Sequence, residues 1–299
     1  MFPLPNKIIG TRSELLKSYI NQIKDLETRE FPYKKKNIFR FCSYNIKFFN
    51  FENYTSNDVK KFIDKVKPDA YSLIEYDVKY DINFKYNKKS TEQILFEQLP
   101  NYGILTVYNK ASIDAKNYSF NTLNKLGTLN NIRYGKSKEL RGFTHMSIKY
   151  NDIIINIITI HLNVCDESGN TRLQEITDLY NYITINNLSC VLIVGDFNEW
   201  NLKKTDKTYN DSLIDFKQRT GLKNFSTKVH DFLKLHNFVN AFHMKDKHPK
   251  FSCWSGKLVD FCYLFKDSWD NSIEIFDIHM PFIPFSDHLP IIIDIGVAN

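Results

Sequence analysis

Residues 190–198, CVLIVGDFN, join a short apolar run to an acidic and an amide side chain. The apolar part has the length and composition of a buried strand, and Gly195 favours a turn directly after it. Asp196 and Asn198 therefore stand at the end of a strand, where a rigid sheet can present chemical groups. This segment predicts a sheet that carries a functional site at its edge.

A second segment places charged side chains in a comparable position. Residues 286–290, SDHLP, put Asp287 and His288 directly before the apolar run 291–295, which closes the chain as a predicted strand. A loop that leads into a strand is fixed by the sheet at one end, so its side chains can be held in place. We therefore expect Asp287 and His288 to belong to the same kind of site.

Three further strands end in polar side chains. Asn45 follows a β-rich run in SYNI, Glu75 follows a short apolar run in LIEYD, and His161 ends a long apolar run in TIHL. Taken singly, such residues are most often turn formers or helix caps. Taken together they combine carboxylate and amide oxygens, which suit Mg²⁺ or Ca²⁺, with imidazoles that can move protons. Phosphodiester hydrolysis needs this combination of a metal ion, an activated water and nearby positive charge.

The pattern of the chain predicts an α/β protein with mixed sheets. Residues 56–66 form a capped amphipathic helix with Val59, Phe62, Ile63 and Val66 on one face. Helical and strand patterns alternate along the chain, but neighbouring strands are also joined by short turns. This mixture favours a layered α/β sandwich over a purely parallel, doubly wound sheet. The other predicted strands are 38–46, 70–74, 102–107, 142–149, 153–162, 190–194 and 258–265, and the other predicted helices are 11–27, 90–99 and 172–185.

The domain organisation follows from where the motifs lie. Residues 1–36 precede all of them and predict an N-terminal helical extension, whereas 37–299 form one domain that carries the motifs. Residues 109–140 are rich in Lys, Asn and Ser and predict a long irregular loop. Residues 201–250 are predicted to be helical and loop-like.

The overall composition indicates a class of partner and a cellular compartment. The net charge of +6 suits a polyanionic partner such as nucleic acid. The five cysteines are scattered and form no CxxC pair, so neither a disulfide framework nor a zinc knuckle is expected. There is no signal-peptide pattern and no apolar run long enough to span a membrane. These features predict an intracellular protein of the cytoplasm or nucleus.

The ordered motifs resemble those of the endonuclease/exonuclease/phosphatase superfamily, which has the fold of deoxyribonuclease I. The resemblance runs from Asn45 to His288, and GDFN followed by SDHLP is its most specific part. It implies a four-layered α/β sandwich, in which two mixed β-sheets pack face to face with helices outside. It also implies that residues 37–299 are a catalytic domain.

The resemblance assigns metal and phosphate contacts to particular residues. Glu75, Asn45 and Asp287 would hold or adjoin a Mg²⁺ ion, with Mn²⁺ as a substitute. Asn45, Arg141 and Asn198 would contact the phosphate of the substrate. Residue 74 is Ile where the family usually has Gln, which is a minor departure.

The resemblance also assigns the chemical steps. Asp196 would orient or deprotonate the attacking water, with Asn198 on a phosphate oxygen. His288 would contact the phosphate and be held by Asp260, because a carboxylate on one ring nitrogen fixes the tautomer and raises the imidazole pKa. His161 would supply a second imidazole at the phosphate.

Departures from the family pattern narrow the substrate. Lys47 stands where the abasic-site endonucleases usually carry an aspartate, and His161 stands where they carry a tyrosine. Both differences disfavour abasic-site cleavage, and Lys47 favours a site with a single metal ion centred on Glu75. The remaining pattern is compatible with the tyrosyl-DNA phosphodiesterase 2 and deoxyribonuclease I branches. Trp254, before the Asp260 strand, is expected to pack in the core rather than stack on a nucleotide.

Three functions stay open at this point. The first is a metal-dependent phosphodiesterase acting on DNA, as a nuclease or in DNA-end processing; the net charge and the Lys-rich segments 34–36, 85–89 and 136–138 favour it. The second is a lipid or inositol phosphate hydrolase, for which the aromatic residues of 48–51 would form an apolar loop. The third is a binding protein of the same fold without catalysis, which the full set of site residues disfavours.

Overall fold

The computed structural model describes most of the region that carries the motifs. The described residues are 38–49, 54–77, 102–108, 114–124, 128–131, 135–138, 141–150, 153–164, 168–200, 226–249, 251–254 and 257–297. The predicted helices 11–27 and 90–99, and with them the N-terminal extension 1–36, lie outside these residues. The Lys-rich segments 34–36 and 85–89 lie outside them as well.

Two mixed sheets and a small hairpin contain the described strands. In both large sheets most neighbours are antiparallel, but β1 and β2 are parallel in the first sheet and β8 and β9 are parallel in the second. The first sheet has the order β12 (Ile273–His279), β13 (Ile291–Val297), β1 (Phe39–Asn45), β2 (Ala70–Asp77) and β3 (Tyr102–Tyr108). The second has the order β10 (Phe238–Asn240), β11 (Asp260–Phe265), β9 (Val191–Asp196), β8 (Ile153–His161), β7 (Arg141–Tyr150) and β4 (Asp114–Asn124), and the hairpin pairs β5 (Thr128–Asn131) with β6 (Gly135–Lys138).

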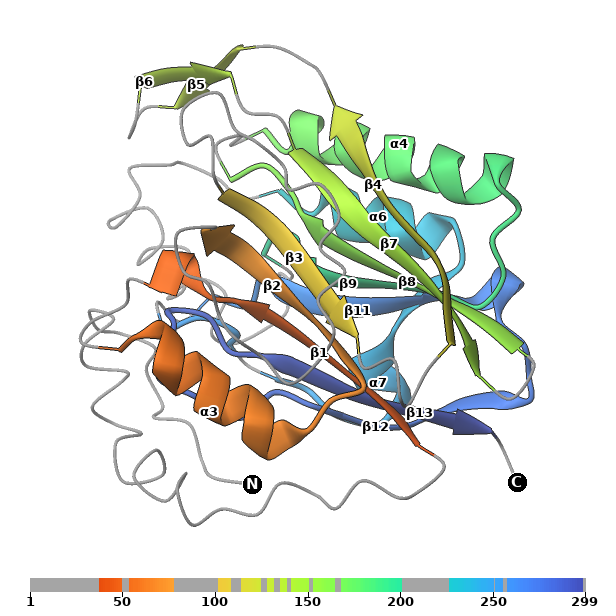
Figure 1. Cartoon of the computed structure of the whole chain (residues 1–299). Helices are drawn as coiled ribbons and strands as arrows, with labels where there is room; N and C mark the ends of the chain where they lie inside the picture. Colours follow the sequence, from red (N-terminus) through yellow and green to blue (C-terminus); the bar gives the residue numbers. More distant parts are fainter. Residues whose placement is uncertain are drawn as a thin grey trace.

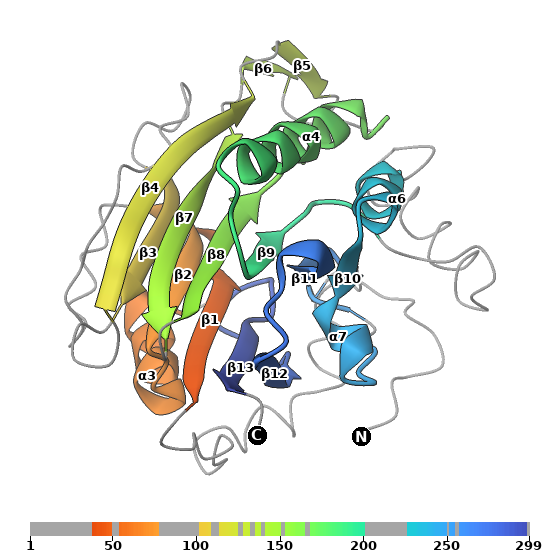
Figure 2. The ribbon, with the colours of Figure 1, turned by 90° about the vertical axis from the view of Figure 1, so that its right-hand side faces the viewer.

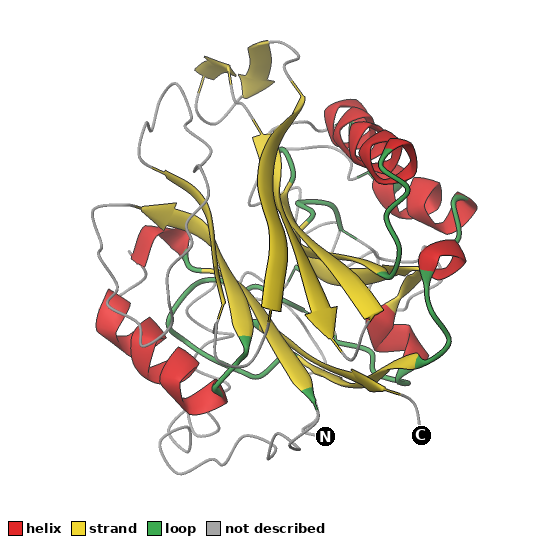
Figure 3. Cartoon of the chain, turned by 45° about the vertical axis from the view of Figure 1, so that its right-hand side comes forward, coloured by secondary structure: helices red, strands yellow, loops and turns green. Residues whose placement is uncertain are grey.

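The helices lie on the two outer faces of the sandwich. Helix α3 (Ser56–Val66) packs on the first sheet, and α4 (Asn170–Ile185) and α6 (Lys228–Leu235) lie on the far side of the second (Figures 1 and 2). Figure 3 shows the strands between these two groups of helices. The short elements are α7 (Ala241–Met244), η1 (Lys47–Phe49) and η2 (Lys266–Ser268). The predicted α/β sandwich of two mixed sheets is therefore confirmed.

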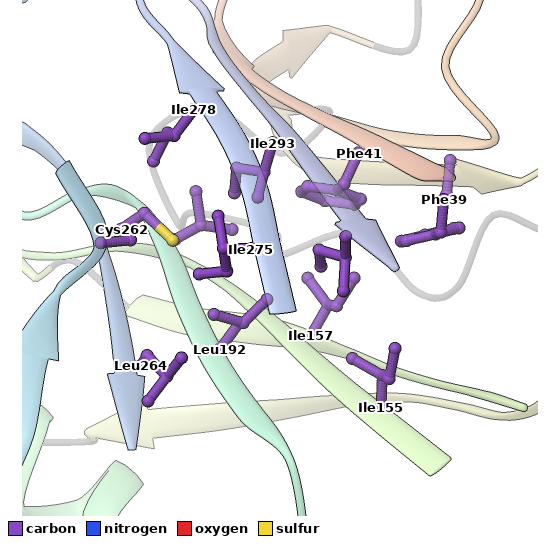
Figure 4. Close-up of a cluster of buried hydrophobic side chains, with 14 of the residues drawn as sticks. Phe39, Phe41, Ile155, Ile157, Leu192, Cys262, Leu264, Ile275, Ile278 and Ile293 are labelled. Atoms are coloured by element: carbon purple, nitrogen blue, oxygen red, sulfur yellow. The ribbon is translucent and has the colours of Figure 1, made fainter. Parts of the chain in front are cut away.

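The core between the sheets explains why they pack face to face. Strand residues alternate between the two faces of a sheet. On β1, Phe39 and Phe41 point into the space between the sheets, whereas Cys42 and Tyr44 point outward to the α3 side. Figure 4 shows this inner cluster, in which apolar side chains of both sheets meet. Its labelled residues are Phe39, Phe41, Ile155, Ile157, Leu192, Cys262, Leu264, Ile275, Ile278 and Ile293.

Helix α3 matches its prediction in bounds and buried face. Thr55 is the N-cap and forms a capping box with Asp58, which satisfies backbone donors at the helix start. Its buried residues are the four predicted ones. The backbone of Lys67 is left-handed, and its N–H closes the helix on the carbonyl of Ile63 at 2.9 Å.

The prediction of an irregular loop over 109–140 is wrong for the described part of that segment. Strand β4 pairs with β7 from Asp114 opposite Lys149 to Asn124 opposite Arg141, and β5 and β6 form the separate hairpin. β4 lies at the edge of its sheet, where one neighbour supplies the backbone hydrogen bonds and polar residues are tolerated. Because the sequence of β4 is polar, its pattern did not predict a strand. Strands β10 and β12 were not predicted either.

Four buried hydroxyl groups link the two sheets beside their apolar core. Thr159 Oγ1 donates to Ser72 Oγ at 2.9 Å, Ser72 Oγ lies 2.8 Å from Thr106 Oγ1, and Thr106 Oγ1 lies 2.7 Å from Thr144 Oγ1. Ser72 and Thr106 belong to the first sheet, and Thr144 and Thr159 to the second. All four residues are buried. A buried hydroxyl left without a partner costs about 1–3 kcal/mol, so this row of hydrogen-bonded hydroxyls favours one relative position of the two sheets.

Candidate active site

The strand order brings the polar strand ends together at one end of the sandwich. His161 at the end of β8 and Asp260 at the start of β11 both stand opposite Asp196 at the end of β9. Asn45 ends β1, and Glu75 lies near the end of the parallel neighbour β2. Because parallel strands end at the same edge, the first sheet contributes Asn45 and Glu75 to a site completed by the second.

Asn45 connects the halves of the site that come from different sheets. Its Nδ2 donates to Asp196 Oδ2 at 3.0 Å and to Glu75 Oε1 at 3.2 Å. Its Oδ1 accepts from the backbone N–H of Lys47 at 3.1 Å, which fixes the orientation of the amide. One buried amide therefore holds two carboxylates side by side.

A bulge in β2 carries Glu75 into the site. The register between β2 and β3 shifts between Ile74 and Tyr76, and Glu75 is the extra residue, with a left-handed backbone (φ 56°). Such backbone in a non-glycine residue costs of order 1 kcal/mol and is often found at functional sites. Burial raises the pKa of Glu75, and the nearby carboxylate of Asp287 raises it further.

Gly195 is required by the turn that presents Asp196 and Asn198. Its φ is +136°, and a Cβ atom there would lie 2.2 Å from the carbonyl oxygen of Ile160. The turn continues through Asn198, whose φ is 48° and whose backbone N–H donates to Asp196 Oδ1 at 2.8 Å. Asn198 Nδ2 donates to the carbonyl of Leu162 at 2.9 Å, which ties this turn to the segment after β8.

Asp196 holds its proton unusually tightly. Burial raises its pKa to about 7, and the carboxylate of Asp260 raises it in the same direction. The positive charge of His288 and the hydrogen bond from Asn198 lower it in part. A carboxyl group with a pKa near neutrality can accept a proton from water at physiological pH.

His288 and Asp260 form a directed pair. His288 Nδ1 lies 2.8 Å from Asp260 Oδ2, and His288 Nε2 lies 3.8 Å from Asp196 Oδ2. Burial by itself lowers the pKa of His288, but the carboxylates of Asp260, Asp196 and Asp287 raise it well above its ordinary value. His288 is therefore protonated at neutral pH, with Nδ1–H on Asp260 and Nε2–H toward Asp196.

His161 is the opposite case, a neutral imidazole. Burial, the guanidinium of Arg141 and the charge of His288 lower its pKa well below the ordinary value. Arg141 Nη1 lies 3.1 Å from His161 Nδ1, and because a guanidinium only donates, Nδ1 accepts and Nε2 carries the hydrogen. Nε2 lies 3.6 Å from Glu75 Oε1 and 3.8 Å from Asp196 Oδ2. His161 is thus a hydrogen-bond donor directed into the site.

The described residues offer two groups of possible metal ligands, both of which include Asp196. Ligand atoms of Glu75, His161 and Asp196 lie within 4.8 Å of one another, as do those of Asp196, Asp260 and His288. A protonated His288 has no lone pair to give, and His161 Nε2 carries a hydrogen. The carboxylates of Glu75 and Asp196 remain, and they are the hard oxygen ligands that Mg²⁺ or Mn²⁺ takes together with water. The chemistry of this donor set therefore fits a divalent ion beside Glu75.

Asp287 lies beside the site but is paired with a lysine. Lys47 Nζ lies 2.6 Å from Asp287 Oδ2. The negative charge of Asp287 raises the pKa of both Glu75 and His288. The sequence does not reveal this ion pair, because its partners are 240 positions apart.

Sequence reasoning also missed a buried ion pair that supports the site. Glu199 directly follows Asn198, and its Oε2 lies 3.0 Å from Arg172 Nε while its Oε1 accepts from the backbone N–H of Val229 at 2.7 Å. Arg172 Nη1 also donates to the carbonyl of Asn163 at 3.1 Å. Helix α4 therefore holds both the loop after β8 and the loop after β9. The only signal in the sequence is a glutamate next to GDFN.

Trp254 has the role in the core that the sequence predicts. Its side chain is fully buried, packs with Phe251 and Phe282, and donates from Nε1 to the carbonyl of Ile283 at 3.3 Å. Phe48 is half-buried, and the side chains of the other aromatic residues of 48–51 lie outside the described part of the chain.

Comparison with solved structures identifies the fold. No family model and no curated protein sequence matches the chain. The human Nocturnin catalytic domain with bound sulfate is similar at 16% identity and a TM-score of 0.58, covering 88% of this chain and 95% of that one. ANGEL2, a 2′,3′-cyclic phosphatase, in complex with adenosine-2′,3′-vanadate is similar at 11% identity and a TM-score of 0.60, covering 89% and 99%.

Two further structures have the same fold, and one of them contains DNA. D. rerio TDP2 complexed with a single-stranded DNA product is similar at 11% identity and a TM-score of 0.56, covering 87% of this chain and 99% of that one. An endonuclease/exonuclease/phosphatase from Beutenbergia cavernae DSM 12333 is similar at 11% identity and a TM-score of 0.53, covering 88% and 72%. The chain therefore has the endonuclease/exonuclease/phosphatase fold, as its motifs predict.

Proposed function

We propose that the chain is a phosphodiesterase that depends on Mg²⁺ or Mn²⁺ and cleaves a phosphodiester bond in nucleic acid, with DNA as the preferred substrate. The observation that carries this proposal is the position of Asp196. Its carboxylate lies beside a metal-type carboxylate, Glu75, on one side and a protonated imidazole, His288, on the other. Hydrolysis of a phosphodiester needs a cation on the phosphate, a proton acceptor for water and a fixed positive charge.

Each residue then has a separate task. Glu75 would hold the divalent ion, which supplies Lewis-acid polarisation of the phosphate when bound. Asp196 takes the proton of the attacking water, for which its pKa of about 7 is suited. His288, held by Asp260, presents a positive charge to the oxygens on which negative charge develops.

The remaining site residues orient the phosphate. His161 donates from Nε2, and Arg141 behind it keeps that hydrogen in place. Asn198 is fixed at the turn after β9 and is the proposed contact to a phosphate oxygen. Asn45 and Asp287 are predicted to adjoin the metal ion; in the structure both also contact Lys47.

Two observations support nucleic acid as the substrate class. The chain carries a net charge of +6, which favours a polyanion. TDP2, one of the structures with this fold, was solved with a single-stranded DNA product. A lipid or inositol phosphate hydrolase is the alternative; half-buried Phe48 at the site is the feature that would favour it.

An intracellular setting is proposed on the state of the cysteines. Cys42, Cys190 and Cys262 are buried free thiols, which is typical of proteins in a reducing compartment. Among the described residues, no helix combines the length and the apolar character needed to cross a membrane.

A substrate panel tests the proposal. Purified protein with Mg²⁺ would be offered plasmid DNA, single-stranded DNA, an abasic duplex, 5′-phosphotyrosyl DNA, RNA, sphingomyelin and an inositol polyphosphate. We expect a DNA substrate to be cleaved fastest and Glu75→Ala to abolish that cleavage. Fastest cleavage of sphingomyelin or inositol polyphosphate would establish the alternative, and no cleavage of any substrate would refute phosphodiesterase function.

A further inference from the structure

Lys47 is held at the edge of the site by its backbone as well as by its ammonium group. Its backbone is left-handed (φ 43°), and its N–H donates to Asn45 Oδ1 at 3.1 Å. Phe48 is left-handed too (φ 57°). Two consecutive non-glycine residues in this conformation are uncommon, and strained backbone of this kind gathers at functional sites. The chain thus turns sharply at the point where Lys47 enters the site.

The ammonium group of Lys47 forms an ion pair with Asp287. Nζ lies 2.6 Å from Asp287 Oδ2, and the two side chains are only 33% and 23% exposed. A partly buried pair of this kind is less screened by salt than a surface ion pair. Asp287 is itself proposed to adjoin the metal ion, and Asn45, which accepts from the backbone N–H of Lys47, donates to Glu75, the proposed metal ligand, at 3.2 Å. Lys47 and a metal ion would therefore compete for the charge of one carboxylate.

The charge balance of the described site gives this competition a consequence. Its carboxylates are Glu75, Asp196, Asp260 and Asp287, whereas Arg141 and Lys47 are its permanently charged cations. A phosphate substrate is itself an anion, so it needs positive charge in the site beside that of a divalent ion. A neutral side chain at position 47 would remove one of these two permanent cations and leave the carboxylate of Asp287 without its partner.

We propose that Lys47 is a permanent cation of the site that lowers its affinity for a divalent metal ion and raises its affinity for an anionic phosphate substrate. By binding Asp287 it weakens the hold of the site on its divalent ion, and by its permanent charge it keeps the metal-loaded site attractive to an anionic substrate. The second half rests on the proposed function, because it requires a phosphate substrate; the first half does not. The proposal thus expects Lys47 to affect the metal and the substrate in opposite directions.

Lys47→Met tests it, with Mn²⁺ as the probe. We expect Mn²⁺ to bind about tenfold more tightly to the variant in titration calorimetry, because a repelling charge a few ångströms away has been removed. On bis(p-nitrophenyl) phosphate, kcat/KM at saturating Mn²⁺ should fall about tenfold or more. Lys47→Arg keeps the charge and should stay near wild type in metal affinity. Lys61→Met, on the exposed face of α3, is the matched control and should change neither quantity.

A double-mutant cycle shows whether the effect passes through Asp287. In an Asp287→Asn background, Lys47→Met should no longer tighten Mn²⁺ binding, because the shared carboxylate is gone. Unchanged or weaker Mn²⁺ binding by Lys47→Met would overturn the proposal, whether or not its melting temperature also falls. Tightening that persists without Asp287 would overturn the competition.

Failure of the proposed function gives a different result. If wild-type protein hydrolyses no phosphodiester but Lys47→Met still tightens Mn²⁺ binding through Asp287, the competition stands and the phosphodiesterase assignment falls. If wild-type protein cleaves DNA but the variant shows no change in Mn²⁺ affinity, the assignment stands and Lys47 has no such role. If wild-type protein binds no Mn²⁺, both are refuted.

Discussion

His288 Nδ1 and Asp260 Oδ2 lie 2.8 Å apart, and this contact decides which ring nitrogen of the imidazole points into the site. Asp260 begins β11 opposite Asp196, so the carboxylate is positioned by the second sheet. His288 comes from the loop before β13, which belongs to the first sheet. The proposed positive charge of the site is therefore held by a contact between elements of different sheets.

Asp260→Asn should lower kcat/KM on the best DNA substrate by at least about 10²-fold, since an amide neither fixes the imidazolium nor stabilises its charge. The loss should be larger at high pH, because the pKa of His288 falls when the carboxylate that raises it is removed. Rate measurements from pH 6 to pH 9 (about this range suffices for an imidazole) check both points. A uniform loss at every pH would argue against the proposed role.

Glu75→Gln should remove metal binding while leaving the fold intact. The substitution keeps the shape of the side chain but replaces a charged oxygen ligand of the kind that Mg²⁺ and Mn²⁺ prefer. We expect turnover to fall by at least about 10²-fold, and the wild-type protein to lose activity in EDTA and regain it with Mg²⁺ or Mn²⁺. Glu274→Gln, at a half-exposed glutamate on β12, is the matched control. Full activity of the wild type in excess chelator would contradict the metal assignment.

The raised pKa of Asp196 predicts how the stability of the metal-free protein depends on pH. The folded protein binds a proton at Asp196 with a pKa of about 7, whereas the unfolded chain releases it near the ordinary value of 3.8. The metal-free protein should therefore lose stability as the pH rises from 3.8 to about 7. Protonated His288, whose pKa is also raised, adds a loss in the same direction at higher pH.

Over the same interval Mn²⁺ should bind more tightly as the pH rises, because the ion and the proton compete for the carboxylate. Urea unfolding in EDTA and calorimetry with Mn²⁺, each at a series of pH values, measure the two trends. Asp196→Asn should flatten the change in stability between pH 4 and pH 7 (about the span of the two pKa values). Part of the slope should survive, because burial also raises the pKa of Glu75. A slope as steep in this variant as in the wild type would show that Asp196 is not responsible.

Arg172→Met should destabilise the protein by about 3–5 kcal/mol, because it leaves the buried carboxylate of Glu199 without its cation. The Glu199 side chain is 0% exposed and Arg172 is 5% exposed, so water cannot replace the lost partner. Adding Glu199→Gln to Arg172→Met should recover part of the loss, since the uncompensated charge is then removed. Urea unfolding at neutral pH measures the wild type and both variants. A double variant no more stable than Arg172→Met would indicate that the pair acts through packing and not through charge.

Local patterns predicted those parts of the fold that depend on neighbours in sequence. A polar cap and the spacing of four apolar residues were sufficient to predict α3, because capping and amphipathic spacing are local properties. The hairpin of β7 and β8 was evident for the same reason. Strand β4 was not, because an edge strand is defined by its hydrogen bonds to β7 and its own sequence is polar.

The site shows the same division. The motifs predicted which residue types would meet, and the structure places the predicted Asp260 beside His288 and Arg141 beside His161. The contacts of Lys47 with Asp287 and of Arg172 with Glu199 could not be predicted, because each depends on how distant segments are oriented in space. The different protonation of the two histidines depends on burial and on nearby charge, which sequence spacing does not report.

The hydroxyl chain from Thr159 through Ser72 and Thr106 to Thr144 has a consequence for how this molecule comes apart. Half of the site moves with one sheet and half with the other, so a small parting of the sandwich breaks the site while each sheet keeps its own hydrogen bonds. Such partial opening requires less free energy than complete unfolding. On heating, function would fail first and the fold later. Because the four hydroxyls hold the sheets together, they should reduce the difference between the temperature at which function is lost and the temperature at which the protein unfolds.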